Sequence, residues 1–267
     1  MSTQDRSFFR RIDIRFPWLK LVAIAVVIIL ATLDLLNLTI SKTTDTYGVI
    51  KVAPMSHHVR IKRDITGKKL VALTFDDGPS STTTPRLLDI LYEKDVKATF
   101  FMLGSAMSAN PDIARRAEKE NHVVASHTMY HQNLIHLSAE AAKNDIYEAT
   151  SVFKDILGRS PAFVRPPYGN INNNVRSNVG APMILWSVDT LDWKSKNVDD
   201  ILAITKEQVY DGAIILMHDI YDTTVDAVPV VIDELRKEGY EFVTVPELTE
   251  IRGVDLQPGI AYYNFRP

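Results

Sequence analysis

The chain has 267 residues, of which 46% are hydrophobic and 24% are charged, and its formal net charge is −3. This length and composition suit one large hydrophobic core, so we expect one main domain with accessory segments. The charge gives no reason to expect nucleic acid as a partner, because phosphate backbones are bound by clustered lysine and arginine. The absence of cysteine excludes disulfides, thiolate metal sites and cysteine nucleophiles, so any metal must be held by histidine and carboxylate.

The N-terminal segment predicts a membrane anchor. Basic side chains in residues 6–20 precede an uncharged apolar run at residues 21–33. Residues 18–40 provide the ~20 residues that a spanning helix needs, and the basic residues 1–17 should stay inside while the rest is exported. The strictly apolar run also suits a cleaved signal peptide, although only Thr39 and Ser41 offer a weak cleavage site. The sequence thus favours a single-pass protein of the cell membrane with an extracellular domain, with a secreted form as the alternative.

Residues 41–68 are polar and mixed in charge, which indicates a stalk. From residue 69 onward, short apolar runs alternate with amphipathic ones, a pattern typical of buried parallel strands covered by helices. The strands are expected at residues 70–75, 98–103, 122–126, 162–167, 183–189, 213–219 and 241–245. The helices are expected at residues 84–95, 111–120, 138–158, 170–180, 197–209 and 223–239. The pattern predicts an α/β domain of about seven β/α units over residues 69–252, followed by a tail at 253–267.

Chemically active side chains stand at the ends of five of these strands. They are Asp76, Asp77, His127, His131, Arg165, Asp189, His218 and Asp219. Seven β/α units can close as a barrel or remain an open sheet, and periodicity fits both. In either arrangement the carboxyl ends of parallel strands meet at one edge, so these side chains should form one site.

A three-ligand metal site is the strongest prediction within this group. His127 and His131 stand four residues apart, a spacing that on a helical turn directs both imidazoles to one ion. Asp77 would complete three ligands and leave a position open for water and substrate, as a catalytic zinc requires. Asp76, its neighbour, would point elsewhere and could handle protons. The alternatives are that the acids cap the helix near Thr84 and that the histidines lie in the core or on the surface.

The remaining candidates each have a structural alternative. His218 ends an apolar strand and suits a proton donor, or a core histidine satisfied by the backbone. Arg165 and Asp189 suit residues that orient a catalytic neighbour, or an ordinary buried ion pair. Trp193 and Leu216 are expected to be pocket walls or core.

Five segments, taken in order, resemble the motifs of the NodB-homology polysaccharide deacetylases, carbohydrate esterase family 4. They are TFDDGP (74–79), SHTMYH (126–131), RPPYG (165–169), DTLDW (189–193) and LMH (216–218). The segment ATFFMLG adds a likeness to the peptidoglycan N-acetylglucosamine deacetylases of Gram-positive bacteria. The second motif departs from the family pattern, because Asn121, Ala125 and Ser126 stand where glycine and asparagine are usual.

The resemblance implies a distorted (β/α) barrel and a divalent ion, zinc or alternatively cobalt or manganese, bound by Asp77, His127 and His131. It also implies that Asp76 is the general base, positioned by Arg165, and that His218 is the general acid, oriented by Asp189. The backbone N–H of Tyr168 would stabilise the oxyanion, and Trp193 and Leu216 would line the pocket for the acetyl methyl group.

The function that follows is removal of N-acetyl groups from a cell-wall glycan, most simply the N-acetylglucosamine of peptidoglycan. The alternatives are a chitooligosaccharide deacetylase, a xylan O-acetyl esterase with the same site, and a non-catalytic membrane-anchored glycan-binding protein. The expected partners are the glycan and the membrane, and no protein partner is evident from the sequence.

Overall fold

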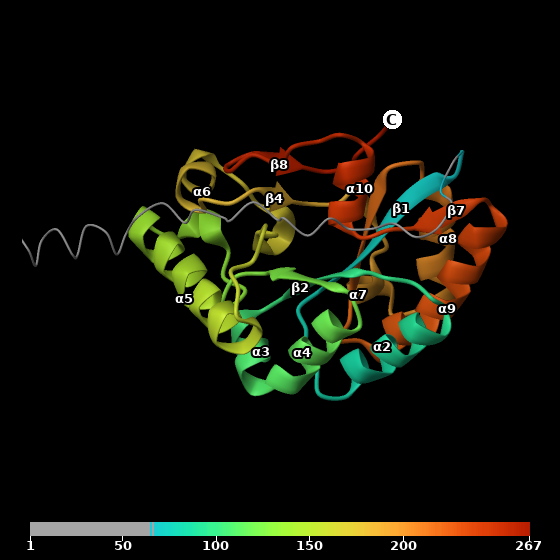
Figure 1. The fold of residues 1–267 in the computed structure, drawn as a ribbon, viewed down its shortest axis with the longest axis horizontal. Coiled ribbons are helices and arrows are strands. Elements are labelled where there is room, and N and C mark those ends of the chain that lie inside the picture. The colour runs from blue at the N-terminus through green and yellow to red at the C-terminus, as the bar shows by residue number, and fades with distance from the viewer. Residues whose placement is uncertain (1–64, 66) are drawn as a thin grey trace, which may run out of the picture. The chain divides into compact units, whose positions relative to one another are not determined.

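The structure is a computed structural model that describes residue 65 and residues 67–267 (Figure 1). The predicted anchor and nearly all of the predicted stalk lie outside the described residues. Within the described part of the chain, no helix is both long and apolar enough to span a membrane.

A parallel sheet forms the centre of the fold. The described strands are β1 (Lys69–Asp76), β2 (Thr99–Met102), β3 (Val123–Ser126), β4 (Met183–Ile184), β5 (Val188–Asp189), β6 (Ala213–His218), β7 (Tyr240–Phe242) and β8 (Ala261–Tyr262). The main sheet has the order β3-β2-β1-β6-β5, with β7 also paired to β1, and β4 pairs with β8. Every one of these pairings is parallel. The predicted α/β fold with a parallel sheet is confirmed.

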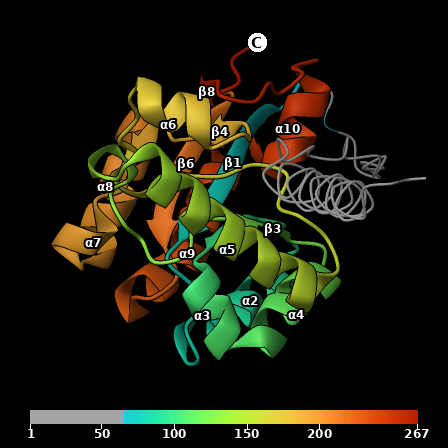
Figure 2. The same cartoon turned by 90° about the vertical axis from the view of Figure 1, so that its left-hand side faces the viewer.

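Helices cover the outside of this sheet (Figures 1 and 2). They are α2 (Thr83–Glu93), α3 (Gly104–Ala109), α4 (Pro111–Lys119), α5 (Ala139–Leu157), α6 (Asn173–Asn178), α7 (Asp192–Ser195), α8 (Val198–Gln208), α9 (Asp222–Lys237) and α10 (Val245–Ile251). The 3-10 turns η2 (Leu134–His136) and η3 (Pro167–Gly169) lie in two of the loops. All six predicted helices are present, and α3, α7 and α10 are additional.

Backbone pairing continues irregularly beyond β3. Val164 pairs with Ser126 of β3 and with Met183 of β4, while β5 pairs with β6. The strand predicted at residues 162–167 is reduced to these bridges, because the two prolines after Arg165 have no N–H to donate. The strand predicted at 183–189 splits into β4 and β5, because Leu185 donates to Tyr262 whereas Ser187 donates to Ile214 of β6.

The two faces of β1 belong to different parts of the core. Val71, Leu73 and Phe75 are completely buried in one cluster with residues of the covering helices. Leu70 and Ala72 belong to a second cluster, which includes residues of β2, β3, β4 and β6. Because side chains alternate along a strand, Thr74 and Asp76 share the face of Leu70 and Ala72. Asp76 is thus a buried carboxylate at the end of an otherwise apolar inner face.

Helix ends follow the sequence signals at some positions and depart from them at others. The Ser138 hydroxyl accepts the Ala141 N–H and so caps α5, which ends at Gly158 in the left-handed region. By contrast, α2 begins at Thr83, one residue before the predicted start. Its cap residue is Thr82, which makes no side-chain capping bond. The Thr84 hydroxyl donates instead to the carboxylate of Asp219, at 2.5 Å.

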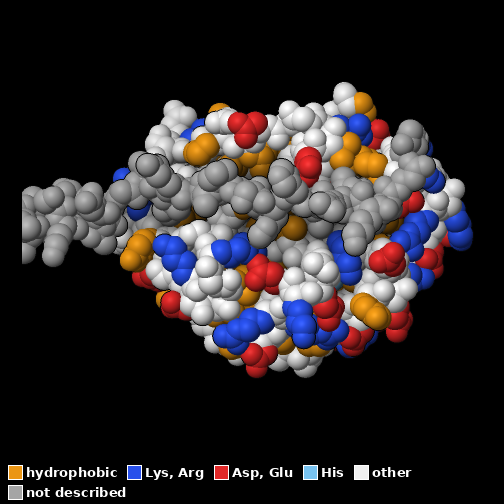
Figure 3. All heavy atoms as spheres, in the orientation of Figure 1, with side chains coloured by type: hydrophobic (Ala, Val, Ile, Leu, Met, Phe, Trp, Pro, Cys, Tyr) orange, Lys and Arg blue, Asp and Glu red, His pale blue; other side chains and the backbone are white. Residues whose placement is uncertain are grey.

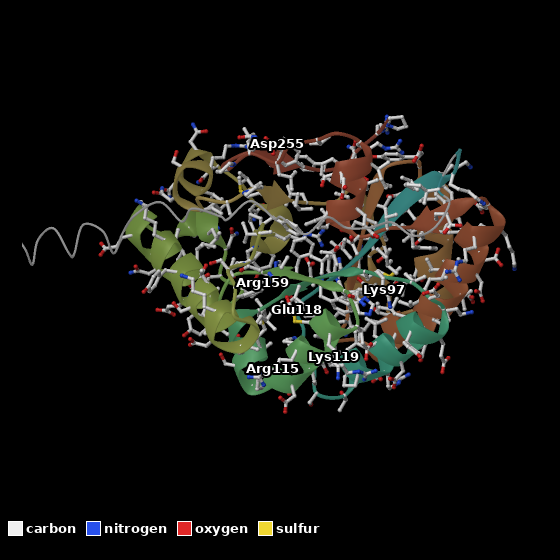
Figure 4. The ribbon with its side chains drawn as sticks, in the orientation of Figure 1. Lys97, Arg115, Glu118, Lys119, Arg159 and Asp255 are labelled. Atoms are coloured by element: carbon white, nitrogen blue, oxygen red, sulfur yellow. The ribbon has the colours of Figure 1, made fainter. Side chains whose placement is uncertain are left out.

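Charged side chains connect several outer elements. On the face shown in Figure 3, basic and acidic side chains are interspersed over α2 and α4. Arg159 extends toward Glu118 (Figure 4), where its Nε lies 2.5 Å from the carboxylate, and it also donates to the Val124 carbonyl of β3. Ion pairs this exposed stabilise a fold by only about 0–1 kcal/mol each, so they orient elements more than they stabilise them.

Candidate metal and catalytic site

The two adjacent carboxylates at the end of β1 face different partners. Asp77 has a φ of 77°, so the chain turns sharply after the strand and separates the two side chains. The buried Oδ1 of Asp76 accepts a hydrogen bond from Arg165 Nη1 at 2.6 Å. Oδ1 of Asp77 lies 3.4 Å from Nε2 of His127 and 3.4 Å from Nε2 of His131. The predicted separation of the two acids is therefore what the geometry shows.

The two histidines converge through a loop. The sequence interpretation placed them on a helical turn, and this was wrong, because residues 127–131 form no helix and Thr128 and His131 have positive φ angles of 72° and 57°. The loop still brings the imidazole centroids to 5.0 Å. Nδ1 of His127 lies 2.7 Å from the Arg165 carbonyl oxygen, so it must donate, and Nε2 is the ring nitrogen that faces the carboxylates.

Asp77, His127 and His131 together fit a divalent metal ion. One ligand atom from each lies within 4.8 Å of the others. Metal–ligand distances of 2.0–2.2 Å place the ligands of a tetrahedral zinc roughly 3.3–3.5 Å apart, which matches the two 3.4 Å separations. The buried Oδ1 of Asp77 has no hydrogen-bond partner among the described residues. One carboxylate oxygen and two imidazole nitrogens thus face one another, an arrangement that a cation would satisfy.

The protonation of these groups suits metal binding. Burial raises the pKa of Asp77, but the nearby histidines, His127 first, outweigh it and lower the pKa below its ordinary value. Burial lowers the pKa of His131, and repulsion from His127 lowers it further. A carboxylate and a neutral imidazole are the forms in which these side chains bind metals.

Arg165 holds Asp76 from inside the core. Its side chain is completely buried, and its guanidinium lies 3.8 Å above the ring of Phe101. Besides Asp76 it donates to Thr74 Oγ1 at 2.9 Å and to the carbonyls of Ile184 and Leu185 at 3.0 Å each. This rigid fork fixes one oxygen of Asp76, whose other oxygen lies 3.7 Å from Nε2 of His127.

His218 ends β6 beside Asp76 of β1 and is oriented by Asp192, so the prediction that Asp189 does so was wrong. Nδ1 of His218 lies 2.8 Å from Oδ1 of Asp192. The other oxygen of Asp192 accepts the His218 backbone N–H at 2.7 Å and the Thr224 hydroxyl at 2.7 Å. The Asp189 carboxylate instead accepts the N–H of Leu191 at 2.9 Å, where it stabilises the turn into α7.

The Asp192 partnership keeps His218 charged. Burial lowers the pKa of His218, but the hydrogen bond and negative charge of Asp192, with smaller contributions from Asp76 and Asp77, raise it to about 9. The imidazole therefore carries a proton at neutral pH, as a general acid must.

Comparison with known proteins gives this geometry a family. The family model described as polysaccharide deacetylase matches residues 63–181. The peptidoglycan-N-acetylglucosamine deacetylase PgdA of Listeria monocytogenes is 43% identical over 196 residues, 73% of this chain and 41% of that protein. A peptidoglycan-N-acetylglucosamine deacetylase of Bacillus cereus is 38% identical over 189 residues, 68% of this chain and 88% of that protein.

The chain belongs to the polysaccharide deacetylase family. The solved structure of the T48 deacetylase with substrate agrees, with a TM-score of 0.71 and 39% identity over 75% of this chain and 99% of that chain. The matched residues of the family model include the proposed metal ligands, Asp76 and Arg165, but not His218. The chain spans about two fifths of the length of the Listeria relative.

Three further residues expected from the family motifs lie close to this constellation. Tyr168, in η3, has a φ of 61°, and its exposed ring lies 4.7 Å from that of His131. Trp193 directly follows Asp192 and is 47% exposed, whereas Leu216 is buried and shares the face of His218 on β6 by alternation. These positions are compatible with the roles that the family motifs imply.

The departures from the family pattern have local partners. Ser126 accepts the Thr128 N–H on its Oγ at 3.1 Å, and its backbone carbonyl accepts the Arg165 N–H at 2.9 Å. Ala125 is buried in the inner core, and Asn121 takes the positive φ of 65° at the turn before β3. The serine thus supports the histidine loop.

The sequence interpretation missed the roles of three buried acids near the site. Asp192 is one. Asp219 packs so closely against Gly78 that a Cβ there would lie 2.1 Å from its Oδ2, and burial, with the charge of Asp77, raises its pKa to about 7. Burial raises the pKa of Asp145 in α5, and hydrogen bonds from the backbone amides of Met129 and Tyr130 oppose this rise only in part. The sequence did offer a signal for Asp145, because a carboxylate on the otherwise mainly apolar face of a predicted helix indicates a specific buried partner.

Proposed function

We propose that this chain is a metal-dependent hydrolase that removes N-acetyl groups from the N-acetylglucosamine residues of peptidoglycan. One observation carries the proposal: three metal-ligand atoms converge beside a buried carboxylate, Asp76, whose register partner on the next strand is a protonated imidazole, His218. Both enzymes named in the sequence comparison support the substrate, since each is a peptidoglycan-N-acetylglucosamine deacetylase.

Asp77, His127 and His131 would hold the ion, which we propose to be zinc, with cobalt or manganese as alternatives. When bound, such an ion polarises a carbonyl group and lowers the pKa of water toward about 7. Asp76 and His218 are register partners at the ends of β1 and β6, and Asp77 directly follows Asp76, so substrate and water would meet these groups at one edge of the sheet.

The protein side chains would move two protons. Asp76, held by Arg165, takes a proton from the attacking water while the oxygen of that water bonds to the acetamide carbon. His218, held by Asp192, gives a proton to the nitrogen as the C–N bond breaks, so the products are acetate and a free amine. We assign the Tyr168 N–H to the oxyanion and Trp193 and Leu216 to the walls around the acetyl methyl group.

We further propose that residues 18–40 anchor the protein in the cell membrane with the catalytic domain outside. The stalk at residues 41–68 would reach about 100 Å when fully extended, by the ~3.3–3.6 Å reach of each residue. Only nearby polymer is within this distance. In a Gram-positive cell that polymer is the wall, where loss of acetyl groups would convert neutral acetamides into ammonium groups.

The test is acetate release by the full-length chain in detergent. Purified peptidoglycan, chitooligosaccharides and acetylated xylan are the substrates, and free amines are measured in parallel because an esterase releases acetate without them. We expect acetate and amine in equal amounts from peptidoglycan, loss of activity with a chelator, and recovery on adding zinc. Full acetate release by the metal-free protein would contradict the mechanism, and release from xylan alone would replace the proposed substrate.

A further inference from the structure

The loop that joins the two histidines, residues 127–131, is strained. Thr128 and His131 both have positive φ angles, and at the β-branched Thr128 this conformation is a genuine outlier. Residues held in such regions are unfavourable by themselves and persist only where surrounding contacts determine them. The position of His131 therefore depends on whatever holds this loop.

Neighbouring backbone groups supply several of these contacts. The Thr128 N–H donates to Ser126 Oγ at 3.1 Å. The carbonyl oxygen of Thr128 accepts the N–H of Gly104 at 2.9 Å, and that of Met129 accepts the N–H of Ser105 at 3.1 Å. The first amides of α3 thus hold two peptide groups of the loop through their oxygens, while the Met129 N–H still needs an acceptor.

Asp145 provides that acceptor from α5. Its Oδ1 accepts the Met129 N–H at 2.8 Å, and only 5% of the residue is exposed. The helix α5 lies beside α3 in Figures 1 and 2, and a Cβ at Gly104 would meet both Met129 and the α5 backbone at Ala149. Loop, α3 and α5 are therefore in close contact at this point.

A carboxylate at this position is costly for α5 itself. The other buried positions of the helix are Ala142, Ile146, Ala149, Thr150 and Phe153, which are apolar except for one threonine. Burying a charged group without strong hydrogen bonds is unfavourable, so an apolar residue would suit the helix better. The bond to the Met129 amide at 2.8 Å, with the neighbouring amide of Tyr130 and the hydroxyl of Thr128, offsets this cost from outside the helix, and all three groups belong to the histidine loop.

We propose that Asp145 is a positioning residue for the metal site. By fixing the Met129 amide it holds the strained loop in the conformation that places Nε2 of His131 3.4 Å from Oδ1 of Asp77. The inference rests on the proposed metal site and assigns to α5 a part in building it. Outer residues that orient metal ligands typically contribute 10–100-fold to metal affinity.

The experiment compares zinc affinity in matched variants of the full-length chain in detergent, after removal of metal by a chelator. Asp145→Ala removes the acceptor, whereas Asp145→Asn keeps a carbonyl oxygen in place. Thr150→Val is the control, because the Thr150 hydroxyl is buried on the same helix and, among the residues that the structure describes, bonds only to the carbonyl of Ile146 within that helix. Zinc dissociation constants are measured by competition with a chromophoric chelator, and the visible spectrum of bound Co²⁺ reports the ligand geometry.

We expect Asp145→Ala to weaken zinc binding 10–100-fold and to change the Co²⁺ spectrum. Asp145→Asn should stay within about threefold of the wild type, since an amide oxygen replaces the carboxylate as acceptor, and Thr150→Val should lower the melting temperature without changing either signal. If Asp145→Ala fails to fold, Asp145→Ser removes the long acceptor with a smaller cavity and should show the same loss.

Wild-type zinc affinity in a folded Asp145→Ala or Asp145→Ser variant would overturn the inference, and so would an equal loss in Asp145→Asn and Asp145→Ala. A wild-type chain that binds no zinc would contradict the proposed metal site itself, which separates the failure of the proposed function from the failure of this inference.

Discussion

Asp76 and Asp77 are adjacent in sequence but differ in what they contact. Asp76 is fixed by the Arg165 guanidinium, whereas Asp77 faces two imidazole nitrogens. We therefore predict that Asp76→Asn binds zinc normally but lowers kcat by about 10²–10⁴-fold, the usual contribution of a general base. Asp77→Ala should lose zinc affinity instead. Metal content after dialysis and kcat with saturating zinc measure the two effects separately, and equal loss of zinc in both variants would show that the division of roles is wrong.

The Asp192–His218 pair predicts a change in pH dependence. With Asp192 in place, His218 has a pKa of about 9 and keeps its proton through neutral pH. In Asp192→Asn the negative charge is lost, so the pKa should fall and activity should decline at lower pH than in the wild type. The measurement is kcat/KM from pH 6 to 10, with Asp189→Asn as the control that keeps the wild-type alkaline limb. An unmoved alkaline limb in Asp192→Asn would contradict this role.

At this scale the sequence identified the right side chains more readily than their contacts. The structure brings the three metal-ligand candidates together with Asp76, Arg165 and His218 at one site. These residues could be predicted because strand ends and the order of motifs can be recognised in a sequence. The choice of Asp189 over Asp192 failed because it depends on the turn at Leu191, where φ is 53°. That turn leads the chain into α7. It places Asp192, three residues after Asp189, within hydrogen-bonding distance of His218. Such a turn has no periodic signal.

At the scale of elements, a buried histidine between β2 and β3, His122, makes the stability of the fold depend on pH. His122 precedes β3, accepts the Ala98 N–H on Nδ1 at 3.1 Å, and packs edge-on against Phe100 of β2. Burial lowers its pKa to about 3, helped by the positive charges of Arg116 and of Lys97, which is marked in Figure 4. The folded state thus keeps this imidazole neutral, while the unfolded chain takes up a proton below pH 6.5.

This difference sets the sign of a stability change. Between pH 6.5 and about 3 the unfolded state binds more protons, so the free energy of unfolding falls as the pH falls. At about 1.4 kcal/mol per pH unit, the loss from this group is roughly 2 kcal/mol at pH 5. His122→Asn keeps an acceptor for Ala98 but does not titrate. Denaturant unfolding of the metal-free proteins at pH 7 and pH 5 should therefore show a smaller loss in the variant, and an equal loss would contradict the assignment.

Strand and helix positions were largely predictable, because buried parallel strands and amphipathic helices have clear patterns. The failures lie where tertiary pairing overrides the pattern. Val164 was expected in a full strand but makes only bridges, and the 183–189 strand changes partner midway. The segment predicted as a tail contributes β8 and buries Phe265, which its mixed composition did not indicate.

For the whole molecule, we predict that residues 18–40 remain as a membrane anchor. The basic flank opposes export and no strong cleavage site follows, so the cellular protein should sediment with membranes and need detergent for extraction. High salt should not release it, because the hydrophobic segment holds it in the bilayer. N-terminal sequencing of the cellular protein distinguishes the alternatives, since a mature terminus near residue 42 would show a secreted form.

The pairing of β8 has a consequence for how the domain is made. β4 is bridged to Val164 on one side, but its parallel partner on the other side comes from residues 261 and 262, and Ala213 at the start of β6 pairs with Asn264. Synthesis runs from the N-terminus, so one edge of β4 and the start of β6 lack these partners until the segment has left the ribosome. The partners of β2 and β3, which precede the histidine loop, lie between residues 69 and 164, whereas β1 also pairs with β7 at residues 240–242. The contacts that hold the histidine loop therefore come from residues that are made well before the segment that completes the sheet.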